Sequence, residues 1–346
     1  MAKLTFSTIL ISYNQRRTIL DAAHSVLDAL GSRGELVCVD DGSTDGTDSL
    51  LDELATQHAN MRVIRHPHSG RPASARNVGL GAAQGDWISF LDGDDLYDVR
   101  RFDRLAAAIA EPSFDSDFAF HDHRVFVDGT VPTAGLPRIS PELDRDLAVT
   151  VADGHPASPD AQSWRLDGDR LAVFLLAQRF VLQTSSFAVR RRLLRERGLV
   201  FDADRVFGED NPFMLACALG SRVTYVRDTL TFYRKHHGSL TAAMNPAGHR
   251  EQVRSLHEQV ALVETHARHA LTATSRSAMQ AMLYEATLHH GYLLEHSGRA
   301  TDAAVCYLRT AASFRRPWAV ALAAKALVRK PKLVVQPLLA ADNRTK

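Results

Sequence analysis

The stretch Trp87-Ile88-Ser89-Phe90-Leu91-Asp92-Gly93-Asp94-Asp95 places a short apolar run directly before an acidic turn. Bulky apolar residues bounded by Gly85 and by this turn predict a buried β-strand. Hard divalent cations take carboxylate oxygens, so Asp92 and Asp94 are candidate ligands for a metal or a sugar. The alternative is that the acidic turn only caps a following helix, which we expect over Leu96 to Ala110.

Strand and helix patterns alternate between the N-terminus and this stretch. Apolar and β-branched runs predict strands at Leu4–Ser12, Leu36–Val39 and Met61–Ile64. Helical spacing predicts helices at 18–30 and 72–83 and, between them, a second helix that carries Leu50, Leu51 and Leu54. Thr44 or Asp45 is the expected N-cap of the second helix. The order βαβαβαβ favours a parallel sheet flanked by helices. In such sheets ligands bind at the carboxyl ends of the strands, so the residues that follow each strand are the candidate site.

Polar side chains follow the first two strands as well. Ser12-Tyr13-Asn14 comes after the first strand, and Asp40-Asp41-Gly42-Ser43 comes after the second. Taken singly, each segment is an ordinary turn, and Arg76 within its helix would be an ordinary solvated charge. Taken together, carboxylates at one sheet edge repel one another unless a cation or sugar hydroxyls occupy the gap.

The second half of the chain changes character twice. Residues 128–169 are rich in Pro, Gly, Asp and Ser and predict a long loop region, which over an α/β site is often functional. Beyond residue 240 only helical patterns remain, so we place a boundary near Thr241 to Pro246. The expected domains are 1–240, which is catalytic, and 241–346, which is helical. Before the loop we expect a strand at 118–120. Between the loop and the boundary we expect helices at 170–177, 190–196 and 211–219, and strands at 184–189 and 223–226.

Composition excludes several classes of protein. The chain has 346 residues, of which 45% are hydrophobic and 23% are charged, and its net charge is +1. This is an ordinary globular mixture and is not basic enough for a nucleic-acid binder. Cys38, Cys217 and Cys306 lie far apart and are odd in number, so neither a disulfide framework nor a zinc site is implied, and a cytoplasmic location is the simplest expectation. No apolar run approaches the length of a membrane span.

Charge is distributed unevenly. Residues 241–346 hold 14 Lys and Arg against 7 Asp and Glu, whereas the preceding part of the chain is acidic. Basic residues surround Trp318, Val320 and Leu327 near the C-terminus. An anionic partner can account for such an asymmetry, so a peripheral contact with the inner face of a membrane is one hypothesis for the helical region. The alternative hypotheses are a contact with a second copy of the chain and a basic face that is only solvated.

The motifs gain specificity from their order. The segments Ile9–Asn14, Val39–Asp45, Ser74–Gly79 and Gly85–Asp95 occur in series, and Phe207-Gly208-Glu209-Asp210 and Tyr233-Arg234-Lys235-His236-His237-Gly238-Ser239 follow them. This series closely resembles the family 2 glycosyltransferases of the GT-A fold. The resemblance covers roughly residues 4 to 241. It implies an inverting transfer of one sugar from a nucleotide-diphosphate donor, most often a UDP-sugar, to the hydroxyl of a glycan or lipid-linked acceptor.

The resemblance also assigns roles to individual residues. Ser12, Tyr13, Asn14, Asp41, Arg76, Asp92 and Gly93 would lie at the donor, with Asp41 at the base or ribose and Asp92 at the ribose or sugar. Asp94 would bind Mg²⁺ or Mn²⁺ bridging the diphosphate, and His236 would be a further ligand. Asp210 would be the general base, and Glu209 would orient the acceptor or take that role itself. A carboxylate is needed because an alcohol is a poor nucleophile, and a metal is needed because the leaving diphosphate develops charge.

Two other interpretations stay open. A sugar nucleotidyltransferase would want a glycine-rich phosphate loop, and Ser12-Tyr13-Asn14-Gln15-Arg16 contains no glycine. An inactive transferase fold acting through its helical tail would not need the carboxylates. Neither Gln178-Arg179-Phe180 nor Gln183-Thr184-Ser185 matches the Gln-x-x-Arg-Trp element of the processive members, so we expect single-sugar addition. His121 and His123 could hold a metal, but a structural or acceptor-side role is favoured.

Overall fold

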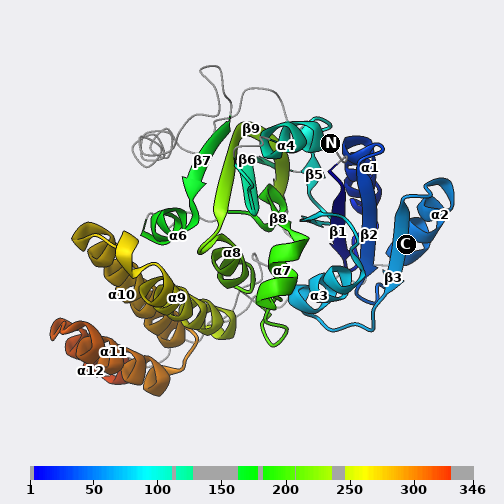
Figure 1. Cartoon of the computed structure of the whole chain (residues 1–346). Helices are drawn as coiled ribbons and strands as arrows, with labels where there is room; N and C mark the ends of the chain where they lie inside the picture. The colour runs from blue at the N-terminus through cyan, green and yellow to red at the C-terminus, as the bar shows by residue number, and fades with distance from the viewer. Residues whose placement is uncertain are drawn as a thin grey trace, which may run out of the picture.

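One mixed β-sheet organises the chain (Figure 1). The computed structural model describes residues 4–110, 114–127, 163–177, 182–206, 208–235 and 246–328. Within these residues the sheet has nine strands, eight of them in the order β3-β2-β1-β4-β8-β6-β9-β5, and β7 pairs with β9.

The N-terminal half forms the parallel part of the sheet, as predicted. Its elements in chain order are β1 Phe6–Ser12, α1 Ile19–Leu30, β2 Gly34–Asp40, α2 Thr47–Gln57, β3 Met61–Arg65, α3 Pro72–Ala82 and β4 Trp87–Asp92. Strand β1 lies between β2 and β4 and is parallel to both. The N-cap of α2 is Gly46 and not Thr44 or Asp45. Asp45 lies one residue before the cap, and its side chain accepts a 3.0 Å hydrogen bond from the amide of Thr47, the first helical residue.

The rest of the sheet is mixed, which the parallel prediction did not include. Its elements are β5 Leu96–Tyr97, α4 Arg101–Ile109, β6 Phe118–Val127, β7 Ser163–Asp167, α6 Gly168–Ala177, the 3₁₀ turn η1 Thr184–Ser186, β8 Phe187–Arg190, α7 Arg191–Arg197, α8 Asp210–Ala218 and β9 Arg222–Lys235. Strand β8 runs antiparallel to both β4 and β6. The helix expected from Leu96 begins only at Arg101, because Leu96 and Tyr97 pair with β9.

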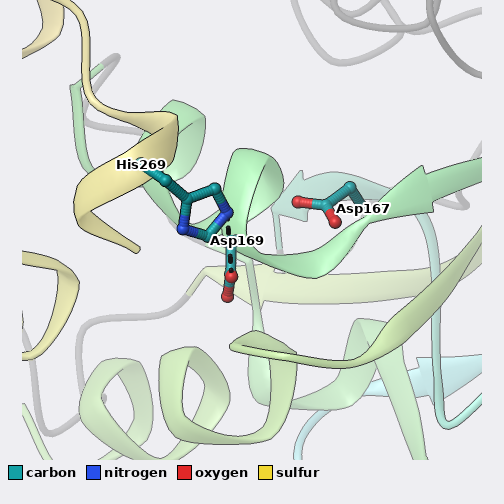
Figure 2. A group of neighbouring side chains, drawn as sticks. All are labelled: Asp167, Asp169 and His269. Carbon is teal, nitrogen blue, oxygen red and sulfur yellow. Dashed lines mark ion pairs between the residues drawn. The ribbon is translucent and has the colours of Figure 1, made fainter. Parts of the chain in front are cut away.

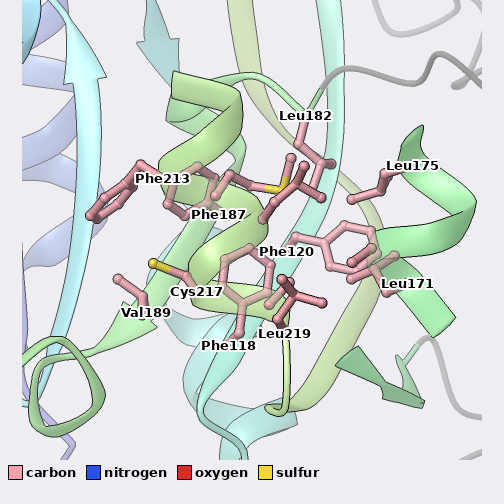
Figure 3. Packing of buried hydrophobic residues seen from close by; sticks show 14 of the residues in the cluster. Phe118, Phe120, Leu171, Leu175, Leu182, Phe187, Val189, Phe213, Cys217 and Leu219 are labelled. Atoms are coloured by element: carbon pink, nitrogen blue, oxygen red, sulfur yellow. The ribbon is translucent and has the colours of Figure 1, made fainter. Parts of the chain in front are cut away.

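Alternation along the strands separates two hydrophobic cores. Phe6 and Leu10 of β1 join the core under α1, α2 and α4, whereas Ile9 between them joins the core on the opposite face. The second core gathers aromatic side chains around α8, as Figure 3 shows for Phe118, Phe120, Phe187 and Phe213. Burial on both faces explains why these strands read as continuous apolar runs.

The last helices are α9 Pro246–His266, α10 Ala273–His296, α11 Ala300–Phe314 and α12 Trp318–Val328, with the 3₁₀ turn η3 Arg268–Ala270 after α9. Val260 and Val263 of α9 and Leu283 of α10 belong to the same core as the aromatic side chains around α8. Helices α11 and α12 form a smaller core of their own with the end of α10. Residues 236–245, which include most of the expected boundary, lie outside the described residues, and the division into two domains stays a prediction. Among the described helices none is both long and apolar enough to cross a membrane.

Candidate functional site

The carboxyl ends of β1, β2 and β4 bring three of the predicted segments together. Ser12 is in register with Asp40, and Ile11 is in register with Asp92. The Asp41 amide donates to the Ser12 carbonyl at 2.8 Å, and the Gly93 amide donates to the Ile11 carbonyl at 3.0 Å. The sheet therefore places the turns after the three strands side by side, as the parallel arrangement predicted.

Arg76 links the carboxylate at the end of β4 to a carboxylate at the start of α8. Its guanidinium donates through Nη1 to Glu209 Oε1 at 2.7 Å and through Nη2 to Asp92 Oδ1 at 2.8 Å. Arg76 is buried, although a lone charge in a helix of small residues is ordinarily solvated. Burial alone would lower the pKa of Arg76, but the charges of Asp92, Glu209 and Asp210 outweigh it and raise the pKa, so the guanidinium stays positive. The three carboxylates therefore surround one fixed positive charge.

Glu209 and Asp210 lie at the start of α8 and have different partners. Glu209 occupies the N-cap position without a side-chain cap bond, and Asp210 is the first helical residue. Burial raises the pKa of the Glu209 carboxyl above its usual range, and the neighbouring Arg76 opposes the shift. Burial likewise raises the pKa of Asp210, against the charge of Arg76 and the hydrogen bond from the Asn211 amide. Of these two carboxylates only Glu209 accepts a hydrogen bond from Arg76, and within the described residues Asp210 has no direct guanidinium contact.

Asp41 is held by a segment that the sequence analysis missed. His66 Nδ1 lies 2.9 Å from Asp41 Oδ1, and the Ser69 and Gly70 amides donate to the same carboxylate at 3.0 and 3.1 Å. Burial acts to raise the pKa of Asp41, but these hydrogen bonds outweigh it and the pKa is lowered. A sequence signal for this segment exists, because the polar residues His66, His68 and Ser69 follow β3 at the same sheet edge.

The turn after β1 is fixed by polar contacts. Ser12 Oγ donates to Asp40 Oδ1 at 3.1 Å, and the Thr44 amide donates to Asn14 Oδ1 at 2.8 Å. Asn14 has a positive φ of 52°, which Asn tolerates better than most residues. Tyr13 remains partly exposed, and its ring stacks on His68 with centroids 4.0 Å apart. Ser12, Tyr13 and Asn14 therefore lie at the carboxyl end of β1, beside the turn after β2 that contains Asp41.

The acidic turn after β4 is tied to β9. Gly93 is closely packed, since a Cβ there would lie 2.2 Å from Gln15 Oε1. Arg234 of β9 donates its amide to Asp95 Oδ1 at 2.9 Å and its Nε to the Asp94 carbonyl at 2.8 Å. Burial and the charges of Asp94 and Asp92 raise the pKa of the Asp95 carboxyl well above its usual range. The charges of Asp94 and Asp92 thus add to the effect of burial in disfavouring ionisation of Asp95.

The remaining predicted residues either lie outside the described residues or form no metal site within them. His236 lies outside the described residues, as do Phe207 and most of the long loop region, 128–162. His121 and His123 flank a register shift between β6 and β9. Burial lowers the pKa of His121 well below its usual range and the pKa of His123 to about 4. No group of three metal-ligating side chains forms around them within the described residues.

The side chains that do form such a group are Asp167, Asp169 and His269 (Figure 2). His269 Nε2 lies 3.4 Å from Asp169 Oδ2, and the carboxylates already accept hydrogen bonds from the Gly220 and Arg170 amides. Asp167 is paired with Arg222 at the start of β9, whereas Arg234, next to the acidic turn, is near the end of that strand. This group is therefore at the opposite edge of the sheet from Asp94.

The chain is similar in sequence to known proteins. The family model described as "Glycosyl transferase family 2" matches residues 7–197. The chain is 29% identical to the uncharacterized glycosyltransferase EpsJ of Bacillus subtilis (strain 168) over 68% of this chain and 62% of EpsJ. It is 36% identical to the putative teichuronic acid biosynthesis glycosyltransferase TuaG of the same organism over 31% of this chain and 42% of TuaG. These alignments therefore cover less than two thirds of either relative.

Solved structures with low sequence identity share the fold. S. aureus TarS residues 1–349, in complex with UDP-GlcNAc, superposes with a TM-score of 0.59 at 15% identity over 93% of this chain and 92% of that one. GalNAc-T7 with UDP, GalNAc and Mn²⁺ gives a TM-score of 0.53 at 17% identity over 74% of this chain and 48% of that one. The expected α/β architecture of GT-A type with C-terminal helices is thereby confirmed. Because the family model matches more than half of this chain, the chain belongs to glycosyl transferase family 2, and it has a fold of the GT-A type.

Proposed function

We propose that this protein is a metal-dependent, inverting glycosyltransferase that moves one sugar from a nucleotide-diphosphate sugar to an acceptor hydroxyl. The observation that carries the proposal is the bridge through Arg76, which joins Asp92 on the donor side to Glu209 beside Asp210. Transfer needs a donor site and a base close together, and the bridge fixes the two relative to each other.

The donor is proposed to lie over the ends of β1, β2 and β4. Tyr13, Asn14 and the segment held by Asp41 would contact the nucleoside, and Asp92 would contact the ribose or the sugar. UDP is the favoured nucleotide, since TarS was solved with UDP-GlcNAc and GalNAc-T7 with UDP. Because the Asp41 carboxylate is occupied by His66, Ser69 and Gly70, its role in this proposal is to shape the nucleoside pocket as well as to contact the base or ribose.

The residues of the acidic turn fit a divalent cation. Burial is the main cause of the raised pKa of Asp95, and the charges of Asp94 and Asp92 add to it. A bound cation would relieve this charge repulsion, and Mg²⁺ commonly needs only one or two carboxylates beside water and phosphate oxygens. Asp94 would hold Mg²⁺ or Mn²⁺, with His236 as a further ligand. When bound, the ion neutralises charge that develops on the departing diphosphate.

Asp210 is proposed as the general base. Glu209 is committed to Arg76 through a direct hydrogen bond, which lowers its basicity, whereas Asp210 has no such bond in the described residues. A raised pKa makes a carboxylate a better proton acceptor near neutral pH. Asp210 would take the acceptor proton during attack on the anomeric carbon, and a single displacement of this kind inverts that centre.

The pathway is proposed from the relatives. Matched proteins include TuaG and the succinoglycan biosynthesis protein ExoO of Rhizobium meliloti (strain 1021), which is 38% identical over 28% of this chain and 27% of ExoO. We therefore place the enzyme in the synthesis of a surface polysaccharide or glycolipid.

An assay of donor hydrolysis tests the proposed function. Purified protein is incubated with UDP-, GDP- and dTDP-sugars with and without Mn²⁺, and nucleotide release is measured. Metal-dependent release from one nucleotide class, lost in Asp94→Ala, supports the proposal. In a parallel incubation with nucleoside triphosphates and sugar 1-phosphates, release of pyrophosphate would instead indicate a nucleotidyltransferase. No turnover or binding of any donor would indicate an inactive interaction protein.

A further inference from the structure

A groove of about 610 Å³ lies at the edge of the sheet opposite the donor site. Its lining includes Leu4 before β1, Trp87 at the start of β4, and arginines from the end of β8 and from α7. Trp87 and Asp92 are the first and last residues of β4, so the groove is about 16 Å from the carboxyl edge at roughly 3.3 Å per residue. It is therefore a separate surface from the predicted donor site.

Four arginines line this groove because of the way β8 joins the sheet. Arg190 is in register with Trp87, and the Arg191 amide donates to the Asp86 carbonyl at 2.8 Å, so α7 starts directly at this edge. Arg192 and Arg195 follow on the same helix. The sequence predicts a basic helix over 190–196 without assigning it a function.

The carboxylates nearby leave two of these charges without a partner. Asp115 pairs with Arg190 at 2.5 Å, and Glu196 lies 3.7 Å from Arg192. Asp86, the other acidic lining residue, accepts from the Thr5 amide and hydroxyl. In the described structure the guanidinium groups of Arg191 and Arg195 make no hydrogen bond or ion pair, and they are one helical turn apart, on the same side of α7.

Two adjacent free guanidinium groups suit an anionic ligand with repeated charges. Guanidinium binds phosphate and carboxylate through paired N–H donors. The volume is in the range of sites for small molecules and is much larger than one ion needs. We propose that this groove binds a segment of an anionic saccharide, one that carries phosphate or carboxylate groups, at a distance from the transfer site. Its identification as a saccharide rests on the proposed function.

Calorimetry without any nucleotide tests the groove separately from transfer. The probes are tetragalacturonate, which carries carboxylates, a glycerol-phosphate tetramer, which carries phosphates, and neutral maltotetraose. The double variant Arg191→Gln/Arg195→Gln is compared with Arg268→Gln/Arg276→Gln, which removes the same charge from residues outside the groove. We expect wild type and the control to bind one or both anionic probes more tightly at low salt, and the groove variant to bind them at least about tenfold more weakly.

The outcomes separate the two proposals. Preference for one anionic probe identifies the charged group, and loss of binding only in the groove variant supports the site. Equal binding by the groove variant, equal binding of maltotetraose, or no binding by wild type overturns it. UDP binding is measured in the same variants and should be unchanged, so a failure of the donor proposal would show in that measurement and would leave the result for the groove intact.

Discussion

Arg76 Nη1 and Glu209 Oε1 are 2.7 Å apart although the two residues are separated by 133 positions in the chain. Both side chains are buried, and the same guanidinium also reaches Asp92. This contact ties α3, which packs on the parallel strands, to the start of α8. It couples the stability of the fold to the electrostatics of the predicted site.

Replacing Arg76 with Met should destabilise the protein in a pH-dependent way. Removing one partner of a buried ion pair typically costs about 3–5 kcal/mol, because a charge is left buried without compensation. Glu209 can escape this cost by taking up a proton. Its folded-state pKa, already raised by burial, would rise further, so the stability is retained at low pH and lost as pH rises through that pKa.

Urea unfolding at pH 5 and pH 8 measures this effect. We expect the loss in Arg76→Met to be larger at pH 8, and we expect Glu209→Gln added to Arg76→Met to recover part of it. An equal loss at both pH values would show that Glu209 does not depend on Arg76 for its charge.

Asp210→Asn should abolish transfer without abolishing donor binding. Asp210 is the first residue of α8 and not its N-cap, so the change leaves the helix start intact. General-base catalysis contributes about 10²-fold to 10⁴-fold, and a loss of that size is expected. Asp204→Asn is the matched control, because Asp204 is a highly exposed side chain in the loop before α8. If Glu209→Gln loses transfer while Asp210→Asn keeps it, the base is Glu209.

The pH dependence of transfer should follow the same carboxyl group. A base must be ionised to accept a proton, and burial raises the pKa of Asp210, so kcat/KM should rise with pH through a midpoint above the usual value of 3.8 for Asp. The raised pKa also means that the contribution of this group to stability falls as pH increases through the same range. A kcat/KM profile that is flat from pH 4 to pH 8 would contradict the assignment.

Sequence reasoning located the parallel strands and the turns that follow them because both depend on local patterns. Apolar runs such as Trp87 to Leu91 mark buried strands, and parallel strands end at one edge. It missed that β8 would insert antiparallel beside β4, since strand pairing depends on partners distant in the chain. For the same reason the sequence indicates Arg76 and Asp41 as site residues but does not show what they contact. The ion pair of Arg76 with Glu209, and the hydrogen bonds of Asp41 with His66, Ser69 and Gly70, form only after folding.

A membrane contact through α12 is a further testable expectation. Val320 and Leu327 are about half exposed, and Lys325 on the same helix is exposed as well. Basic residues near an anionic bilayer contribute about 1 kcal/mol each. We expect the protein to float with vesicles that contain phosphatidylglycerol at low salt, and Val320→Ser/Lys325→Gln/Leu327→Ser to reduce this. Val99→Ser/Val200→Ser, changed at exposed valines elsewhere, is the control. No salt-sensitive flotation of wild type would remove the membrane hypothesis.

The central claim, that the acidic turn after β4 binds a nucleotide diphosphate through a divalent cation, is tested by calorimetry of UDP, GDP and dTDP with and without Mn²⁺. We predict that wild type binds UDP only when Mn²⁺ is present, that Asp94→Ala abolishes this binding, and that Asp103→Ala, which removes an exposed carboxylate on α4, leaves it unchanged. UDP binding of comparable affinity without metal, or its persistence in Asp94→Ala, would contradict the account.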